Sequence, residues 1–167
     1  SIKRAQDFGL ENISIDLIYG SPTSSLEIWK DNLNKTIALE VPHISSYALT
    51  VEPKTALENW IENGKVESPK EAEQNREFFY MKDFLKNHNF DHYEISNFGK
   101  PGFHSKHNSS YWKYCEYLGI GPSAHSYNGN EIRSWNVASN HQYIKKINLN
   151  TLAKEEEILS PKDQFNE

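Results

Sequence analysis

The stretch "HNSSYW", from His107 to Trp112, places a histidine directly before an asparagine, two serines, a tyrosine and a tryptophan. A histidine can ligate a haem iron, and neighbouring aromatic rings can cover a flat apolar group. A plainer interpretation is a helix N-terminus with a polar cap and with the aromatic rings buried beneath it. Composition alone favours this plainer interpretation.

Asp16 is the second residue whose type and position point to chemistry. It lies between Ile15 and Leu17 in an alternating apolar stretch that is typical of a strand. Carboxylates are uncommon in strands because burying an unpaired charge is costly. The residue is therefore a candidate to accept hydrogen bonds from a ligand at the carboxyl end of a parallel strand. The alternative is a structural aspartate that pairs with a lysine or a backbone N–H group.

Other chemistries have weaker support in the sequence. The seven histidines form no HExxH motif and no Cys/His zinc pattern, and a two-histidine metal site at His104 and His107 is disfavoured because the segment between them is not clearly helical. The single cysteine, Cys115, excludes a disulfide or a cysteine-rich cluster within this chain. The glycines of "GIGPSAHS" lack the strand–turn–helix context of a phosphate-binding loop.

Composition bounds the class of protein. The 167 residues are 37% hydrophobic and 25% charged, which fits one globular domain or parts of two. The net charge of −5 and the absence of a basic stripe predict no nucleic-acid partner. No apolar run approaches the roughly 18 residues of a transmembrane segment. The first residues do not resemble a signal peptide, so we expect a cytoplasmic protein.

The elements that must position these residues begin with a strand–helix–strand unit. Residues 13–19 alternate as a strand, a capping box of Ser24 and Glu27 precedes a helical pattern over 25–39, and 43–53 read as a second strand. Short links between these elements predict parallel strands. Small or polar side chains at Ser46, Ala48 and Thr50 share one parity, and we expect them to line the inside of a barrel together with Asp16.

The rest of the chain alternates shorter elements with loops. The patterns predict a helix over 55–62, a turn at Gly64, a helix that starts at 68–71, a strand over 90–96, a loop-rich region over 97–121 with a short helix around 108–116, a hairpin turn at 128–129, a helix over 139–147 and a polar linker over 148–157. The first residues read as the end of a helix and the last ones as the start of another. We therefore expect a piece of a longer protein.

Four segments together resemble one known family. "NISIDLIYGSPTSSLEIWKDNL", "HISSYALTVEPKT", "YEISNFGKPGFHSKHNSSYW" and "YLGIGPSAHSY" are similar, in this order, to the HemN/HemW branch of the radical SAM proteins. The resemblance implies an α/β fold: the C-terminal part of a partial (β/α)6, TIM-like barrel with an α+β accessory region. It implies barrel units over 1–62, the accessory region over 63–147, and a linker with the start of a truncated domain over 148–167.

Two kinds of protein share this branch. One is the oxygen-independent coproporphyrinogen III oxidase or dehydrogenase of porphyrin biosynthesis, and the other is the HemW-type haem chaperone. "HNSSYW" matches the HNxxYW motif of the chaperones, and "GIGPSAHS" also resembles them. The resemblance therefore favours a chaperone that passes haem to client proteins, and it leaves open whether the full-length protein is an enzyme.

The resemblance also implies site residues. Asp16, Thr50 and His125 match positions that contact S-adenosylmethionine, Asp16 through the ribose hydroxyls. His107 matches the haem-binding histidine, and Tyr111 and Trp112 complete the haem motif. The CxxxCxxC motif that holds the [4Fe–4S] cluster of the family is not in this chain, and no metal ligands are expected within it. We expect the isolated chain to be inactive, to bind no cofactor tightly, and to form a homodimer through unpaired sheet edges.

Overall fold

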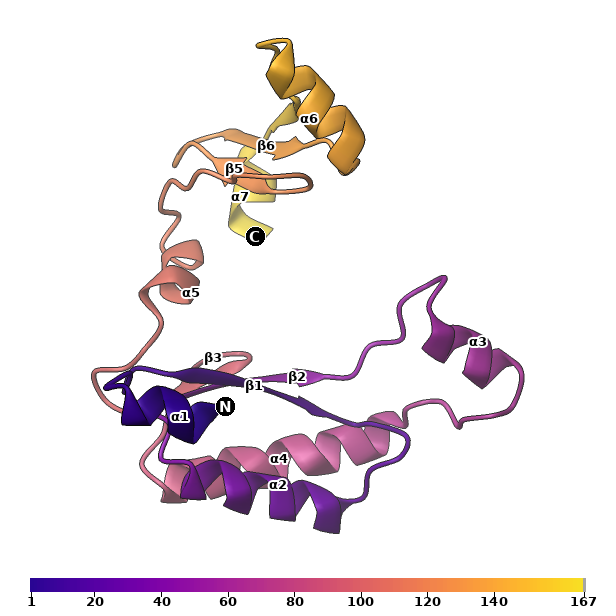
Figure 1. The fold of residues 1–167 in the computed structure, drawn as a ribbon, viewed down its shortest axis with the longest axis vertical. Helices are drawn as coiled ribbons and strands as arrows, with labels where there is room; N and C mark the ends of the chain where they lie inside the picture. Colours follow the sequence, from indigo (N-terminus) through magenta and orange to yellow (C-terminus); the bar gives the residue numbers. More distant parts are fainter. Residues whose placement is uncertain (167) are drawn as a thin grey trace. The chain divides into compact units, whose positions relative to one another are not determined.

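The computed structural model describes residues 1–166. The chain divides into two compact units, with the boundary in the sequence after Ser105. Figure 1 shows the elements in chain order. The first unit contains α1 (Ile2–Asp7), β1 (Ser14–Tyr19), α2 (Leu26–Ala38), β2 (His43–Ala48), α3 (Ala56–Glu62), α4 (Glu71–Asn87), β3 (Asp91–Glu94) and β4 (Asn97–Gly99). The second contains α5 (Lys106–Tyr111), β5 (His125–Tyr127), β6 (Ile132–Asn136), α6 (Asn140–Asn148), β7 (Lys154–Ile158) and α7 (Pro161–Asn166).

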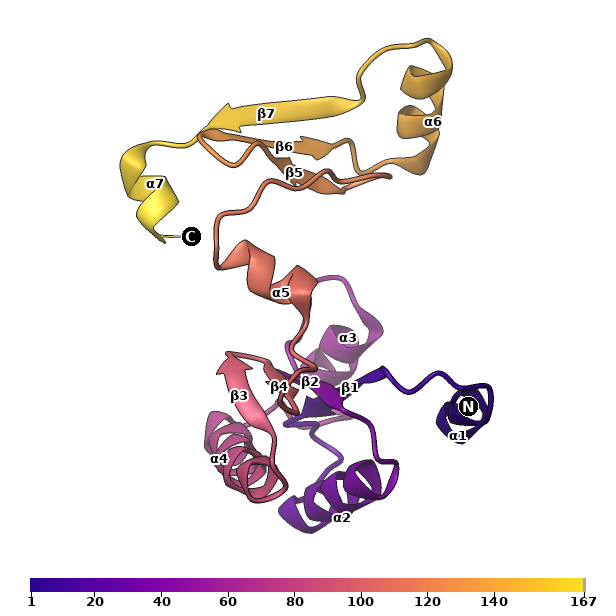
Figure 2. The ribbon, with the colours of Figure 1, turned by 90° about the vertical axis from the view of Figure 1, so that its left-hand side faces the viewer.

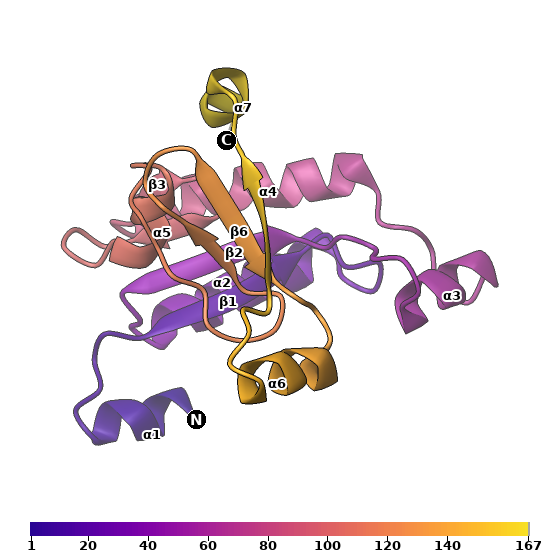
Figure 3. The ribbon, with the colours of Figure 1, turned by 90° about the horizontal axis from the view of Figure 1, so that it is seen from above.

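The sheet of the first unit has the strand order β1-β2-β4-β3. β1 and β2 are parallel and run side by side in Figure 3, and α2 connects them. β4 is antiparallel to both β2 and β3. The helices α2 and α4 lie on the same side of the sheet in Figures 1 and 2. The predicted parallel βαβ unit and the α/β fold class are therefore confirmed.

The core of the first unit lies between this sheet and its two helices. The apolar face of β1, with Ile15, Leu17 and Tyr19, packs against it. Trp29 also donates a hydrogen bond from its indole N–H to the carbonyl of Glu77, 3.1 Å away, and this bond joins α2 to α4. The buried apolar side chains are Trp29, Leu33, Val41, Ile44, Met81, Leu85, Phe90 and Phe98.

Two predicted helix starts are wrong by one or more residues. The predicted capping box of Ser24 and Glu27 does not form, because Ser25 is the N-cap of α2 and its hydroxyl accepts a hydrogen bond from the amide of Ile28. α4 begins at Glu71, after Lys70 as N-cap, rather than at 68–71 with Ser68 as cap. Adjacent serines, and a proline close to the start, left both positions ambiguous in the sequence.

The expected inner face of β2 is also wrong. Ser14 pairs in register with His43 and Asp16 pairs with Ser45, so these residues share a face of the sheet. Ile44 belongs to the core on the helix side, and Ser46 has the same parity. The burial does not alternate, because all residues from His43 to Ser46 are buried. A strand that is covered on both faces carries no polarity signal for its inner face.

β4 is an element that the sequence pattern did not predict. The predicted strand over 90–96 is confirmed as β3, but Asn97–Gly99 lies in the stretch that reads as a loop. Asparagine and glycine are depleted in strands, so local composition argued against this element. β4 nevertheless occupies the position between β2 and β3, and all of its residues are buried.

The second unit is built on an antiparallel sheet with the order β5-β6-β7. The predicted hairpin is confirmed, since β5 and β6 flank the turn at Asn128 and Gly129. The predicted helix over 139–147 is α6, and the short helix expected around 108–116 is α5, which begins and ends earlier.

The predicted linker over 148–157 is wrong in its second half. Lys154–Ile158 forms the edge strand β7 and pairs with β6 along its length. The ion pair of Arg133 with Glu157 ties the two strands together. The charged sequence of β7 resembles a linker because natural edge strands carry charged side chains.

The compact units divide the chain at a different place from the predicted domain limits. Residues 63–105 belong to the first unit because α4, β3 and β4 pack on β1 and β2. The predicted domain boundaries at residues 62 and 147 refer to the domains of the full-length family proteins, and they stay predictions. Within the described residues, no helix combines the length and the apolar character that crossing a membrane requires.

Candidate functional site

Asp16 lies in the middle of β1 on the sheet face that does not pack against α2 and α4. Its side chain is exposed, whereas its neighbours Ile15 and Leu17 point into the core. Asp16 pairs in register with Ser45, whose hydroxyl donates a 2.8 Å hydrogen bond to the side-chain oxygen of Asn97. The strand therefore presents a carboxylate over a polar surface, where it can accept hydrogen bonds from ligand hydroxyls.

A buried histidine next to Asp16 is a feature that the sequence patterns missed. Both ring nitrogens of His43 lie 2.6 Å from a hydroxyl, Nδ1 from that of Ser14 and Nε2 from that of Tyr93. Burial lowers the pKa of His43, and nearby His104 acts in the same direction, whereas Asp16 and Glu94 oppose the shift. A neutral imidazole donates at one nitrogen and accepts at the other, so it satisfies this pair of hydroxyls.

Tyr93 extends this network to the end of the first unit. Its hydroxyl accepts a 3.0 Å hydrogen bond from the amide of Ser105, and its ring stacks on that of His104 with centroids 4.3 Å apart. Burial raises the pKa of Tyr93. The register of β2 could have revealed the network, because it places His43 on the face of Ser14 and Asp16.

α4 fixes the two loops at the carboxyl ends of β1 and β2. The buried carboxylate of Glu77 accepts a 2.6 Å hydrogen bond from the amide of Gly20, directly after β1. The side chain of Gln74 donates to the carbonyl of Leu49, just before Thr50. Gly20 has a φ of 75°, and a Cβ there would lie 2.2 Å from Gln74, so this close approach requires glycine. Thr50 itself lies beyond the end of β2 and is exposed.

His107 lies in the short helix α5, and its side chain is exposed. Its Nε2 lies 3.1 Å from the hydroxyl of Tyr111, one turn further along, and the two rings meet edge to face. Tyr111 is 47% exposed and Trp112 is 54% exposed. The plainer interpretation of "HNSSYW", with the aromatic rings buried beneath a cap, is therefore wrong.

His125 is the first residue of β5 and is exposed. It pairs in register with Trp135, and the two ring centroids lie 6.0 Å apart. Asp16 and Thr50 belong to the first unit, and His125 belongs to the second. Within residues 1–166, no three histidine, cysteine, aspartate or glutamate side chains converge in a way that could hold a metal ion.

Comparisons with curated proteins return one recurring name, although no family model matches the chain. The chain is 39% identical to "Heme chaperone HemW" of Lactococcus lactis over all of its 167 residues, which are 44% of that relative. It is 37% identical to "Heme chaperone HemW" of Bacillus subtilis over 147 residues, 88% of this chain and 38% of the relative. A mouse relative, "Radical S-adenosyl methionine domain-containing protein 1, mitochondrial", is 35% identical over 68% of this chain and 26% of the relative.

A solved structure has the same fold. The coproporphyrinogen III oxidase HemN of Escherichia coli, described as a radical SAM enzyme, superposes with a TM-score of 0.76 over 98% of this chain and 40% of its own. At 19% identity this likeness concerns the fold alone. The chain belongs to the HemN/HemW branch of the radical SAM proteins.

The chain spans less than half the length of these HemN/HemW relatives. The resemblance inferred from the four sequence segments is confirmed, and so is the fold class of a partial radical SAM barrel with an accessory region. Radical SAM proteins as a family use S-adenosylmethionine and a [4Fe–4S] cluster in their full-length form. The roles of individual residues in this chain stay predictions.

The residues present fit both groups that the HemN/HemW resemblance implies. The exposed Asp16 carboxylate matches the ribose hydroxyls of S-adenosylmethionine, because it can accept from two donors. The exposed His107 imidazole matches a haem iron, for which histidine is a common ligand. The exposed rings of Tyr111 and Trp112 can cover an apolar macrocycle.

Proposed function

We propose that this chain is the part of a HemW-type haem chaperone that carries its haem-contacting residues. The recurring name "Heme chaperone HemW" among relatives that are 33–39% identical is the observation that carries the proposal. The exposed His107, with the Tyr111 hydroxyl 3.1 Å from its Nε2, supplies the chemistry, and Trp112, the next residue after Tyr111, is also exposed. The full-length protein binds haem through His107 and passes it to client proteins.

S-adenosylmethionine has three proposed contact residues in this chain. Asp16 accepts hydrogen bonds from the ribose hydroxyls of S-adenosylmethionine, and Thr50 and His125 contact the same molecule. The cluster cysteines lie outside this chain, because its single cysteine cannot form a CxxxCxxC motif. The cluster and S-adenosylmethionine together supply radical chemistry in this family. The isolated chain is inactive and binds none of these groups tightly.

A haem titration of the full-length protein tests the proposal. The His107→Ala variant should bind ferric haem at least tenfold more weakly, because it lacks the iron ligand. His141→Ala is the matched control, since His141 is an exposed helical histidine of the same unit and should leave the affinity unchanged. Equal affinity of the wild type and His107→Ala would contradict the proposed role.

The fold shared with HemN supports a second candidate function. In that case the full-length protein is an oxygen-independent coproporphyrinogen III oxidase of porphyrin biosynthesis. An anaerobic assay with coproporphyrinogen III, S-adenosylmethionine and a reductant distinguishes the two. We expect no protoporphyrinogen product from cluster-loaded protein, and sustained turnover would favour the oxidase.

The setting and assembly of the protein belong to the same proposal. A single cysteine fits a reducing compartment such as the cytoplasm. The strand order leaves β1 at an edge of the first sheet, and a free edge favours a homodimer of the isolated chain. The net charge of −5 argues against a nucleic-acid partner.

A further inference from the structure

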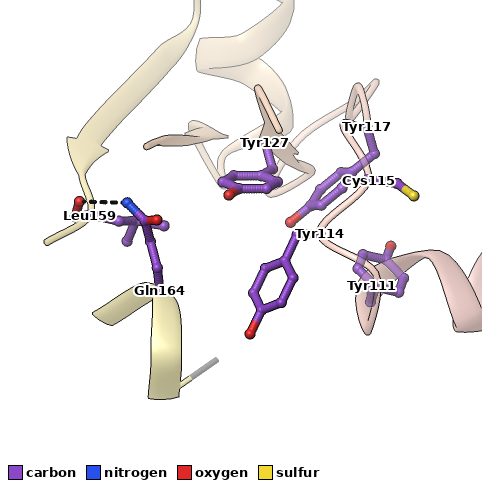
Figure 4. A pocket seen from close by; sticks show the side chains of 7 residues that line it. All are labelled: Tyr111, Tyr114, Cys115, Tyr117, Tyr127, Leu159 and Gln164. Carbon is purple, nitrogen blue, oxygen red and sulfur yellow. Dashed lines mark hydrogen bonds between the residues drawn. The ribbon is translucent and has the colours of Figure 1, made fainter. Parts of the chain in front are cut away.

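A pocket in the second unit is lined by four tyrosines and is the starting point of the inference (Figure 4). Its volume is about 340 Å³, at the lower end of the range for ligand pockets, so it can receive only one edge of a tetrapyrrole. Figure 4 shows the rings of Tyr114, Tyr117 and Tyr127 on the far side of the pocket from Gln164. We call it the tyrosine pocket, with the lining residues Tyr111, Tyr114, Cys115, Tyr117, Tyr127, Leu159 and Gln164.

The walls of the tyrosine pocket have the chemistry that a conjugated macrocycle requires. The ring centroid of Tyr117 lies 5.0 Å from that of Tyr111 and 6.2 Å from that of Tyr127, so three rings form one aromatic wall. Burial raises the pKa of Tyr117, and nearby Tyr111 acts in the same direction, which keeps the phenol neutral. Aromatic rings stack on flat apolar groups while their hydroxyls remain available for a polar edge.

The backbone of Tyr114 has the left-handed conformation that often follows the end of a helix. Its φ is 52°, in the left-handed region, which is uncommon for residues other than glycine and unfavourable for a bulky side chain. Its ring is nevertheless 49% exposed, so burial of the ring does not compensate for this conformation. Backbone hydrogen bonds close this turn after α5, among them that from the amide of Cys115 to the carbonyl of Ser110, and they fix the position of the Tyr114 side chain at the pocket.

Tyr111 links the tyrosine pocket to His107. Its ring lines the pocket, and its hydroxyl lies 3.1 Å from Nε2 of His107. Nε2 is the imidazole nitrogen farther from the backbone and therefore the one better placed to reach an iron atom. The hydroxyl and Nε2 form a hydrogen bond in either tautomer of the imidazole, with Nε2 as acceptor or as donor. In both cases Nε2 has no free lone pair for an iron atom.

We propose that the tyrosine pocket would hold one edge of the haem macrocycle, and that the Tyr111 hydroxyl caps Nε2 of His107, the nitrogen that would hold the iron, while no haem is bound. This inference rests on the proposed function, since it assigns the haem of that function to a binding pocket. We call this role of the tyrosine pocket the haem seat. The Tyr111 ring would stay in the aromatic wall, and the exposed His107 imidazole would rotate away from the Tyr111 hydroxyl to hold the iron.

Titrations of the full-length protein with ferric haem test the cap. Tyr111→Phe keeps the ring and removes the hydroxyl, so haem should bind about threefold more tightly, as expected for the loss of one competing exposed hydrogen bond. Tyr143→Phe is the matched control, because the Tyr143 hydroxyl accepts from Gly121 and lies outside the tyrosine pocket. An affinity of Tyr111→Phe that equals or falls below that of the wild type would overturn the cap.

The seat is tested by Tyr114→Ala in the same titration. Tyr114 is half exposed, so its truncation leaves the fold intact, and circular dichroism checks this. The affinity should fall about tenfold while the absorption spectrum of the bound haem stays that of the wild type, because stacking is lost but the iron ligand is not. Unchanged affinity would overturn the seat. His107→Ala in the same series tests the proposed function separately, because it removes the proposed iron ligand and leaves the lining of the tyrosine pocket unchanged.

Discussion

The two units of this chain bury apolar side chains very differently. The first unit encloses a cluster of eight apolar residues, among them Leu33, Ile44 and Met81, between its sheet and two helices. Among residues 106–164, the buried apolar residues are Ala153 and Leu159, whereas Leu118 is 80% exposed and Ile120 is 84% exposed. The first unit therefore carries its own source of stability, and the second unit has much less.

The difference follows from the hydrophobic effect, which scales with the apolar area removed from water. The second unit relies more on strand pairing and on ion pairs such as that of Arg133 with Glu157. Exposed ion pairs contribute little to stability. A ligand that binds the folded form stabilises it by mass action, so haem bound to the second unit should raise its stability.

The largest expected effect is a core truncation. Leu33→Ala should lower the free energy of unfolding of the first unit by about 2–5 kcal/mol, because it leaves a cavity in a fully buried cluster. Leu118→Ala, the matched change in the second unit, should change the free energy of unfolding of that unit by less than about 0.5 kcal/mol. Amide hydrogen exchange measured at increasing urea concentrations gives the free energy of unfolding of each unit separately. A large loss from Leu118→Ala would show that the second unit has a core of its own.

The next effect concerns a buried carboxylate. Glu77→Ala removes the acceptor of the Gly20 amide and should destabilise the first unit by about 1–3 kcal/mol. Glu73→Ala is the control, because Glu73 forms an exposed ion pair with Arg76 on the same helix and should cost little. The same urea series measures both variants. Equal losses of unfolding free energy from the two variants would show that the hydrogen bond to Gly20 does not stabilise the first unit more than an exposed ion pair does.

A smaller loss of stability is expected from substitutions at one glycine turn in each unit. Gly129 has a φ of 75° in the hairpin of the second unit, and Gly64 has a φ of 67° in the first. Replacing either glycine by alanine should cost about 1 kcal/mol, because alanine is strained in the left-handed region. Hydrogen exchange should detect the loss in the affected unit only. A loss of protection in both units from either variant would contradict the expected local effect.

The smallest effect is the pH dependence that His43 gives to the first unit. Because the folded-state pKa is lowered, mainly by burial, the unfolded chain binds the proton first as the pH falls below the ordinary value of 6.5. The stability contribution of His43 is therefore complete above pH 6.5 and is lost as the pH falls toward its folded pKa. In His43→Gln this part of the pH dependence should disappear. An identical pH profile for the two proteins would contradict the shift.

The sequence predicted the elements with strong local signals and missed those without them. The alternation of Ile13 to Tyr19 and the turn at Asn128 and Gly129 predicted β1 and the hairpin correctly, because period and turn chemistry are local. β4 and β7 were missed because their residues, "NFG" and "KEEEI", favour loops and form strands only through tertiary pairing.

The site was predictable to a similar degree. The alternation of β1 predicts that Asp16 lies on the face opposite Ile15 and Leu17, and the family motif identifies His107 as a candidate. The network of His43 with Ser14 and Tyr93 depends on strand register, which one sequence does not encode locally. The tyrosine pocket joins side chains from α5, the loop after it, β5 and α7, so no spacing along the chain reveals it.

The proposed function depends on His107 as the iron ligand of bound haem in the full-length protein. The most direct measurement is the absorption spectrum of ferric haem with the His107→Gly variant, recorded with and without free imidazole. We predict that the variant loses the wild-type Soret band and that imidazole restores it, because the small ligand enters the space left by the side chain. A His107→Gly variant that keeps the wild-type spectrum and affinity without imidazole would contradict the claim.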